Sequence, residues 1–198
     1  MMAMMFDDSV DLTTAVLEGI KDMTRREAFY GEVKNWYFEP RTGHLVAELT
    51  NGKTVVSKYA INEVVAVAMN YEKAGLPADK VIGCKFVNGQ AVNVCASEHI
   101  GWHNKMYAKA MFMSNRFKIT DIKCEKLQDI SDNDCLHEGI TNIDGQHFGF
   151  FDKKKSVYVC KLTPKRAFEA LINRISRKGF WDSNPNVMCY SIQLIKEQ

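Results

Sequence analysis

The fold of this chain is predicted outward from one stretch of its sequence, Leu17-Glu18-Gly19-Ile20-Lys21-Asp22-Met23-Thr24-Arg25-Arg26. A short amphipathic segment ends at Gly19, and glycine is the usual helix stop because it enters the left-handed conformation freely. Three cations then fall within six residues and repel one another unless an anion lies among them. That anion is either a phosphate or carboxylate ligand, or the chain's own Asp22 and Glu27 in a solvated basic turn. The residues alone favour the second interpretation.

Length and composition limit the class of protein. A chain of 198 residues fits one domain with decorations, or at most two small domains, and 46% apolar with 25% charged residues is typical of an ordinary globular core. We therefore expect a single domain over 1–198. The formal charge of +2 is too small for a general nucleic-acid binder, so any anion site must come from local clustering.

The sequence gives no sign of export or membrane insertion. Met1 to Phe6 is too short for the apolar region of a signal peptide, and no run reaches the roughly 20 apolar residues of a membrane helix. The six cysteines are scattered and form no Cys-x-x-Cys pair, which is typical of reduced thiols. We expect a cytoplasmic protein without membrane contact.

On either side of the opening stretch, the pattern predicts a helix over 9–18 and then a run of strands. Between 31 and 57, apolar segments are separated by turns at Pro40-Arg41-Thr42-Gly43 and Asn51-Gly52, and Asn-Gly is a strong hairpin signal. This β-meander is interpreted as an insertion into the domain.

Further strands and two helices are predicted beyond the meander. Residues 60–69 form a nearly continuous apolar run, and Asn88-Gly89 predicts a hairpin between 83–87 and 91–96. The remaining expected elements are strands over 106–112, 116–127 and 187–195, and helices over 131–138 and 164–177, capped by Ser131 and by Thr163 with Pro164. Many strands with few short helices indicate an α+β fold.

The opening stretch resembles the signature of ASCH domains, a branch of the PUA-like superfamily of small β-barrels. Four residues match the family's signature: Gly19, Lys21, Thr24 and Arg26. Two residues depart from it, since Ile20 and Asp22 stand where the family usually has Arg and Thr. Four later stretches also resemble markers of this family: 59–65, 104–106, 116–140 and 181–185. Of these, 104–106 and 116–140 resemble an uncharacterised bacterial and phage subgroup. The resemblance implies a small mixed β-barrel with a few flanking helices and an inserted β-meander.

The resemblance also implies a chemistry. Characterised amidohydrolases of this group release acetate from N4-acetylcytidine with a Lys and a Thr of the signature and a distant Glu. These two positions are Lys21 and Thr24 here: Thr24 would attack the amide carbonyl, and a neutral Lys21 would take its proton. Ala167 stands where the family enzyme has its Glu. Three glutamates are candidates for that role, the first being nearest in sequence: Glu169, Glu63 and Glu138.

A binding module is the other function that the resemblance implies. PUA-like barrels hold RNA or a modified base, with basic side chains on phosphate and aromatic rings for stacking. The expected ligand-binding residues are Arg25, Arg26, Trp102, Asn104, Lys105, Trp181 and Asn184, together with Lys21. Because the family's Glu is replaced by Ala167, binding of RNA or a modified nucleoside is favoured over amide hydrolysis.

No metal or other cofactor is expected. Cys95, His99 and His103 are spaced by four, which places ligands on one helix face, but Gly101 interrupts the segment and no fourth ligand is near in sequence. The acidic run over 129–134 lacks the Gly and Glu of a calcium loop.

Overall fold

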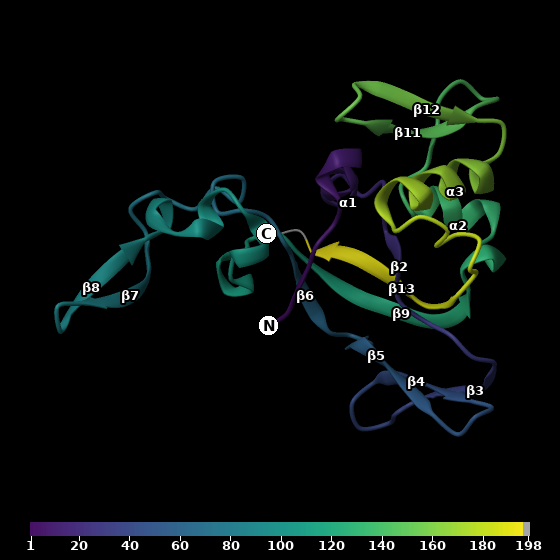
Figure 1. Cartoon of the computed structure of the whole chain (residues 1–198), viewed down its shortest axis with the longest axis horizontal. Coiled ribbons are helices and arrows are strands. Elements are labelled where there is room, and N and C mark those ends of the chain that lie inside the picture. The colour runs from purple at the N-terminus through teal and green to yellow at the C-terminus, as the bar shows by residue number, and fades with distance from the viewer. Residues whose placement is uncertain (196–198) are drawn as a thin grey trace. The chain divides into compact units, whose positions relative to one another are not determined.

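The computed structural model describes residues 1–195, which divide into two compact units. Unit 1 comprises Met1–Phe6, Val64–Phe117 and Ile195, and unit 2 comprises Asp7–Glu63 and Lys118–Leu194. Figure 1 shows the elements of both units in chain order. The expected α+β class is confirmed, because most elements are strands and the helices are few and short. Compact units can belong to one domain, so the single domain expected over 1–198 stays a prediction.

The main sheet of unit 2 places a late strand between two earlier ones. The strands are β2 (Met23–Phe29), most of β9 (Arg116–Lys126) and β13 (Asn186–Ile195), and β13 lies between β9 and β2. β13 is antiparallel to β2, with Tyr190 opposite Thr24 and Cys189 opposite Arg25. Since successive side chains of a strand point to opposite faces, Thr24 and Arg25 face opposite sides of this sheet.

The segment before β2 is fixed by a helix stop. The 3₁₀ turn η1 (Asp8–Val10) and the helix α1 (Leu12–Leu17) occupy the region predicted as a helix over 9–18. Gly19 has a φ of 75°. Its N–H donates to Val16 and the N–H of Ile20 donates to Ala15, which is the double hydrogen bond of a Schellman motif. The predicted stop at Gly19 is therefore confirmed.

The predicted meander forms a separate three-stranded sheet in unit 2. It contains β3 (Val33–Phe38), β4 (His44–Leu49) and β5 (Thr54–Ala60), and Gly43 and Gly52 adopt positive φ at its two turns. Tyr59 of β5 packs edge-on against Tyr190 of β13, with ring centroids 5.4 Å apart. The two sheets of unit 2 thus share a buried aromatic contact.

A 3₁₀ turn, two α-helices and a three-stranded sheet complete the described part of unit 2. The elements are η6 (Leu127–Asp129), α2 (Asp132–His137), β10 (Thr141–Asn142), β11 (Phe148–Asp152), β12 (Val157–Lys161) and α3 (Pro164–Ile175). The predicted caps are confirmed, since Ser131 and Thr163 accept hydrogen bonds from backbone N–H groups of α2 and α3. α3 buries Ala167, Phe168 and Leu171. The β11–β12 hairpin was not predicted from the sequence.

Unit 1 contains a parallel pair and a hairpin. β1 (Ala3–Met4) pairs with β6 (Val64–Val67), and β7 (Val81–Val87) pairs with β8 (Gln90–Cys95) across the predicted Asn88-Gly89 turn. Short 3₁₀ turns follow: η2 (Ala96–Glu98), η3 (Ile100–Trp102), η4 (Lys105–Tyr107) and η5 (Ala110–Phe112). The strand predicted over 106–112 is wrong. The Asn104 side chain accepts the N–H of Met106 and so begins a turn, and a local bond of this kind competes with strand pairing.

No sheet of residues 1–195 closes into a barrel, so the PUA-like barrel stays a prediction. No helix in the same range is both long and apolar enough to cross a membrane.

Candidate functional site

Lys21 lies in the interior of unit 2 rather than in a solvated turn. Only 2% of the residue is exposed. Its ammonium donates to the carbonyl oxygens of Met23, at 2.7 Å, and of Glu138, at 2.9 Å, and to the Glu138 carboxylate. An ammonium has three protons, so these three acceptors satisfy it completely.

Arg25, which lies on β2, also donates hydrogen bonds to the Glu138 carboxylate and to two other carboxylates. It donates to Glu138 Oε1 at 3.0 Å, to Glu125 Oε1 at 2.8 Å and to Asp134 Oδ2 at 2.8 Å. Lys123 also pairs with Asp134, at 2.6 Å, and with Glu125, at 3.0 Å. We call this set of three cations and three carboxylates the buried charge network: Lys21, Arg25, Lys123, Glu125, Asp134 and Glu138.

The buried charge network explains how Lys21 and Arg25 can lie close together in the chain without a bound anionic ligand. Its carboxylates come from β9 and from the region of α2, not from the Asp22 considered above, which instead pairs with His137. The prediction of a solvated turn is wrong for Lys21 and Arg25, because both are enclosed and paired with protein carboxylates. Neither cation is available to a phosphate in this arrangement.

Burial and charge act in opposite directions within the network. Burial lowers the pKa of Lys21 and Glu138 opposes that shift, while Arg26 and Arg25 lower the pKa further. Burial also acts to raise the pKa of Asp134, but its hydrogen bonds from Lys123 and Arg25 prevail and hold that pKa below the ordinary value of 3.8. Asp134 therefore stabilises the fold in its ionised form.

We expect Asp134→Asn to remove an acid-sensitive part of the stability. A carboxyl whose pKa is lower in the folded than in the unfolded state stabilises the fold above its unfolded pKa and loses this effect as the pH falls through its folded pKa. The variant should thus be less stable than wild type by about 1–2 kcal/mol at neutral pH. Urea unfolding from about pH 7 down to pH 3 should show this difference shrinking. A difference that stays constant with pH would contradict the assignment.

Thr24 lies on the other side of β2. It is 4% exposed, stands opposite Tyr190 in the register, and its hydroxyl accepts a hydrogen bond from Arg26 Nε at 3.3 Å. None of the hydrogen bonds of Lys21 goes to Thr24. The resemblance pairs these two residues chemically, and in this structure their polar atoms have separate partners.

Trp181 and Asn184, two of the predicted ligand-binding residues, both contact Gln128. Trp181 packs edge-on against Phe168, with ring centroids 6.1 Å apart, and its carbonyl accepts a hydrogen bond from Gln128 Nε2. Asn184 Oδ1 accepts the backbone N–H of Gln128 at 2.8 Å. The adjoining cavity, of about 300 Å³, is here called the Trp181 cavity; it is lined by Gln128, Thr163, Lys165, Arg166, Glu169 and Trp181.

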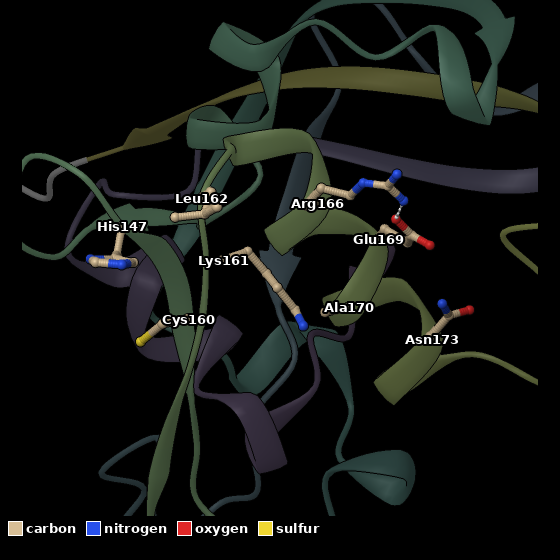
Figure 2. A pocket seen from close by; sticks show the side chains of 8 residues that line it. All are labelled: His147, Cys160, Lys161, Leu162, Arg166, Glu169, Ala170 and Asn173. Carbon is tan, nitrogen blue, oxygen red and sulfur yellow. Dashed lines mark hydrogen bonds and ion pairs between the residues drawn. The ribbon is translucent and has the colours of Figure 1, made fainter.

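A larger cavity lies between the end of β12 and α3 (Figure 2). We call it the Lys161 cavity; its volume is about 630 Å³ and its lining is His147, Cys160, Lys161, Leu162, Arg166, Glu169, Ala170 and Asn173. Arg166 and Glu169 line both cavities and form an ion pair of 2.8 Å across one turn of α3. The predicted catalytic Glu169 is therefore paired with Arg166, whereas Lys21 is paired with Glu138.

The other predicted ligand-binding residues belong to unit 1. Trp102 is half-buried in η3, and exposed Asn104 uses its side chain to cap η4. Lys105 donates to the carbonyl oxygen of Phe6. Asn104 and Lys105 thus have structural partners within unit 1.

The spacing of Cys95, His99 and His103 does not produce a metal cluster. His99 Nδ1 accepts the N–H of Gly101 at 2.9 Å, and His103 lies 3.3 Å from a Glu72 oxygen. In the range 1–195, no three His, Cys, Asp or Glu side chains are grouped so that they could hold a metal ion.

No family model, curated protein or solved structure matches this chain. The likeness to ASCH domains therefore depends on the motifs themselves. Of the residues that the structure adds to the site, Lys161 and Arg166 gave no signal in the sequence, because single cations beside a strand and on a helix are ordinary surface residues.

Proposed function

We propose that this chain is a divergent ASCH-like domain of the PUA-like superfamily, and that it binds RNA or a modified nucleoside in the Trp181 cavity. The sheet of β9, β13 and β2 and the meander of β3, β4 and β5 would supply the strands of the barrel. The aromatic contact between Tyr59 and Tyr190 joins these two sheets and supports that architecture.

The observation that supports binding best is the convergence of Trp181, Gln128 and Glu169 with two cations around one cavity. An aromatic ring offers an apolar surface to a base, and amide and carboxylate groups can pair with its polar edge. Lys165 and Arg166 add positive charge beside them, as phosphate requires. Lys21 and Arg25 have a different role in this proposal, since they hold β2 to the region of α2 through Glu138.

We expect the wild-type protein to bind cytidine or N4-acetylcytidine without releasing acetate. Trp181→Leu should weaken binding about tenfold or more, because stacking on an aromatic side chain contributes roughly 1–3 kcal/mol per base. Trp181 is only 7% exposed, so circular dichroism must show that Trp181→Leu is folded, and Trp36→Leu, at the exposed Trp36 of β3, is the control for losing a tryptophan elsewhere in the same unit. Isothermal titration calorimetry measures affinity, and an enzymatic acetate assay measures turnover. Equal losses in both variants, or no binding by wild type, would contradict the proposal.

A second candidate function is amide hydrolysis, and the position of the Glu138 carboxylate beside Lys21 favours it. Glu138 supplies the carboxylate that the sequence leaves unassigned at Ala167. In such a reaction, Lys21 would first lose a proton to Glu138, Thr24 Oγ1 would then bond to the acyl carbon as the carbon–nitrogen bond breaks, and the hydroxyl proton would pass through Lys21 to the departing amine. Water would then release the acid and restore Thr24.

The acetate assay separates the two functions. Release of acetate that falls by orders of magnitude in both Thr24→Ala and Lys21→Met would establish the hydrolase, because nucleophile and base act as a unit. Both variants also change buried residues, so circular dichroism must show that each is folded. Under the binding proposal, wild type releases no acetate above background.

A further inference from the structure

The Lys161 cavity contains a cation that its surroundings do not neutralise. Lys161 is exposed, and Figure 2 shows its side chain extending from the end of β12 toward α3. None of the residues described in 1–195 forms an ion pair with its ammonium. The neighbouring Arg166 is paired with Glu169, but 72% of the Arg166 side chain is exposed.

We propose that the Lys161 cavity holds the phosphate of a nucleotide whose base occupies the Trp181 cavity. This inference rests on the proposed nucleoside-binding function and narrows the ligand class from a nucleoside to its phosphorylated form. Arg166 and Glu169 line both cavities, so a ligand that spans them passes this ion pair. Lys161 lines the first of these cavities and Trp181 lines the second.

The volume of the Lys161 cavity fits this ligand. Small-molecule sites in proteins are roughly 300–1,000 Å³, and the Lys161 cavity has about 630 Å³. That volume exceeds the needs of a single phosphate and leaves room for part of the sugar. The Trp181 cavity is smaller, at about 300 Å³, as suits a base.

Side chains rather than helix amides would hold the phosphate. The first N–H groups of α3 already have acceptors, since Arg166 N donates to Thr163 Oγ1 and Lys165 N donates to Asp132 Oδ1. Lys161 and Arg166 can instead form charge-assisted hydrogen bonds with phosphate oxygens. An exposed ion pair stabilises a fold only slightly, so Arg166 can exchange Glu169 for a phosphate at little cost.

The predicted preference is measured by titrating cytidine and cytidine 5′-monophosphate into the full chain at matched ionic strength. We expect wild type to bind the monophosphate about tenfold more tightly than cytidine, because one charge-assisted hydrogen bond contributes an affinity gain of about that size. Lys161→Gln should lower this ratio several-fold. The control Lys154→Gln removes an exposed lysine of the β11–β12 loop and should leave the ratio unchanged.

Glu169→Gln gives a test of opposite sign. Removing this carboxylate frees Arg166 and removes a repulsion, so the preference for the monophosphate should rise several-fold above wild type. Using a ratio cancels any contribution of Glu169 to the base itself. A merely structural role of Glu169 would lower both affinities and leave their ratio unchanged.

The outcomes distinguish this inference from the function on which it rests. If cytidine binds and the monophosphate binds equally well, the phosphate site is overturned and nucleoside binding stands. If the monophosphate is preferred but Lys161→Gln preserves the preference, the phosphate lies elsewhere and the inference is again wrong. If neither compound binds, both proposals fail.

Discussion

Replacing Glu138 with alanine should lower the free energy of unfolding by about 3–5 kcal/mol, as loss of one partner of a buried ion pair does. The Glu138 carboxylate accepts hydrogen bonds from both Lys21 and Arg25. The side chain of Lys21 is 2% exposed and that of Glu138 is 6% exposed. The variant leaves two enclosed cations short of an acceptor. Urea unfolding followed by circular dichroism measures the change.

The matched control for Glu138 is another glutamate of unit 2. Glu169→Ala breaks the ion pair with Arg166, whose side chain is 72% exposed, and should cost only about 0–1 kcal/mol. A double variant, Lys21→Met with Glu138→Leu, should recover part of the stability lost in Glu138→Ala, because apolar groups can replace a buried pair. Equal effects of Glu138→Ala and Glu169→Ala would refute the buried charge network as a stabilising element.

Gly149→Ala should separate two strands and cost about 1–3 kcal/mol or more, in the range of overpacked cores. Gly149 of β11 stands opposite Cys160 of β12. A Cβ atom at Gly149 would overlap the carbonyl oxygen of Val159 and lie 3.2 Å from the Cα of Cys160. Backbone atoms cannot rotate away as a side chain can, so β12 must move.

The control for Gly149 is Gly83, a strand glycine of β7. A Cβ there would meet only Lys109 Nζ, at 4.0 Å, and Gly83→Ala should change stability by no more than about 1 kcal/mol. Thermal unfolding measures both variants. Since Cys160 and Lys161 line the Lys161 cavity, a displaced β12 should also reduce the preference for a nucleoside monophosphate. A fully stable Gly149→Ala protein would contradict the tight pairing of β11 with β12.

Local signals in the sequence predicted much of the fold. The stop at Gly19, the hairpin at Asn88-Gly89 and the cap at Thr163 with Pro164 each depend on a few neighbouring residues, and each appears in the structure. The strand expected over 106–112 failed for the same reason, since a local bond from the Asn104 side chain begins a turn instead.

The candidate site was less predictable because it is assembled from distant segments. Lys21 and Glu138 are 117 positions apart in the chain, and no periodicity links them. The sequence offered Glu138 as one of three possible carboxylates and could not choose among them. The β11–β12 hairpin that forms a wall of the Lys161 cavity was not predicted either, so the contribution of Lys161 became visible only in the structure.

The position of β13 between β9 and β2 has a consequence for biosynthesis. β2 pairs with a strand that the ribosome makes much later, and until then β2 and β9 both lack a neighbour that they have in the finished sheet. Pairing across so long a stretch of chain is slow, and unpaired strand edges attract other chains. The nascent protein therefore passes through a period in which its central sheet is incomplete, and this is when a chaperone would protect it most.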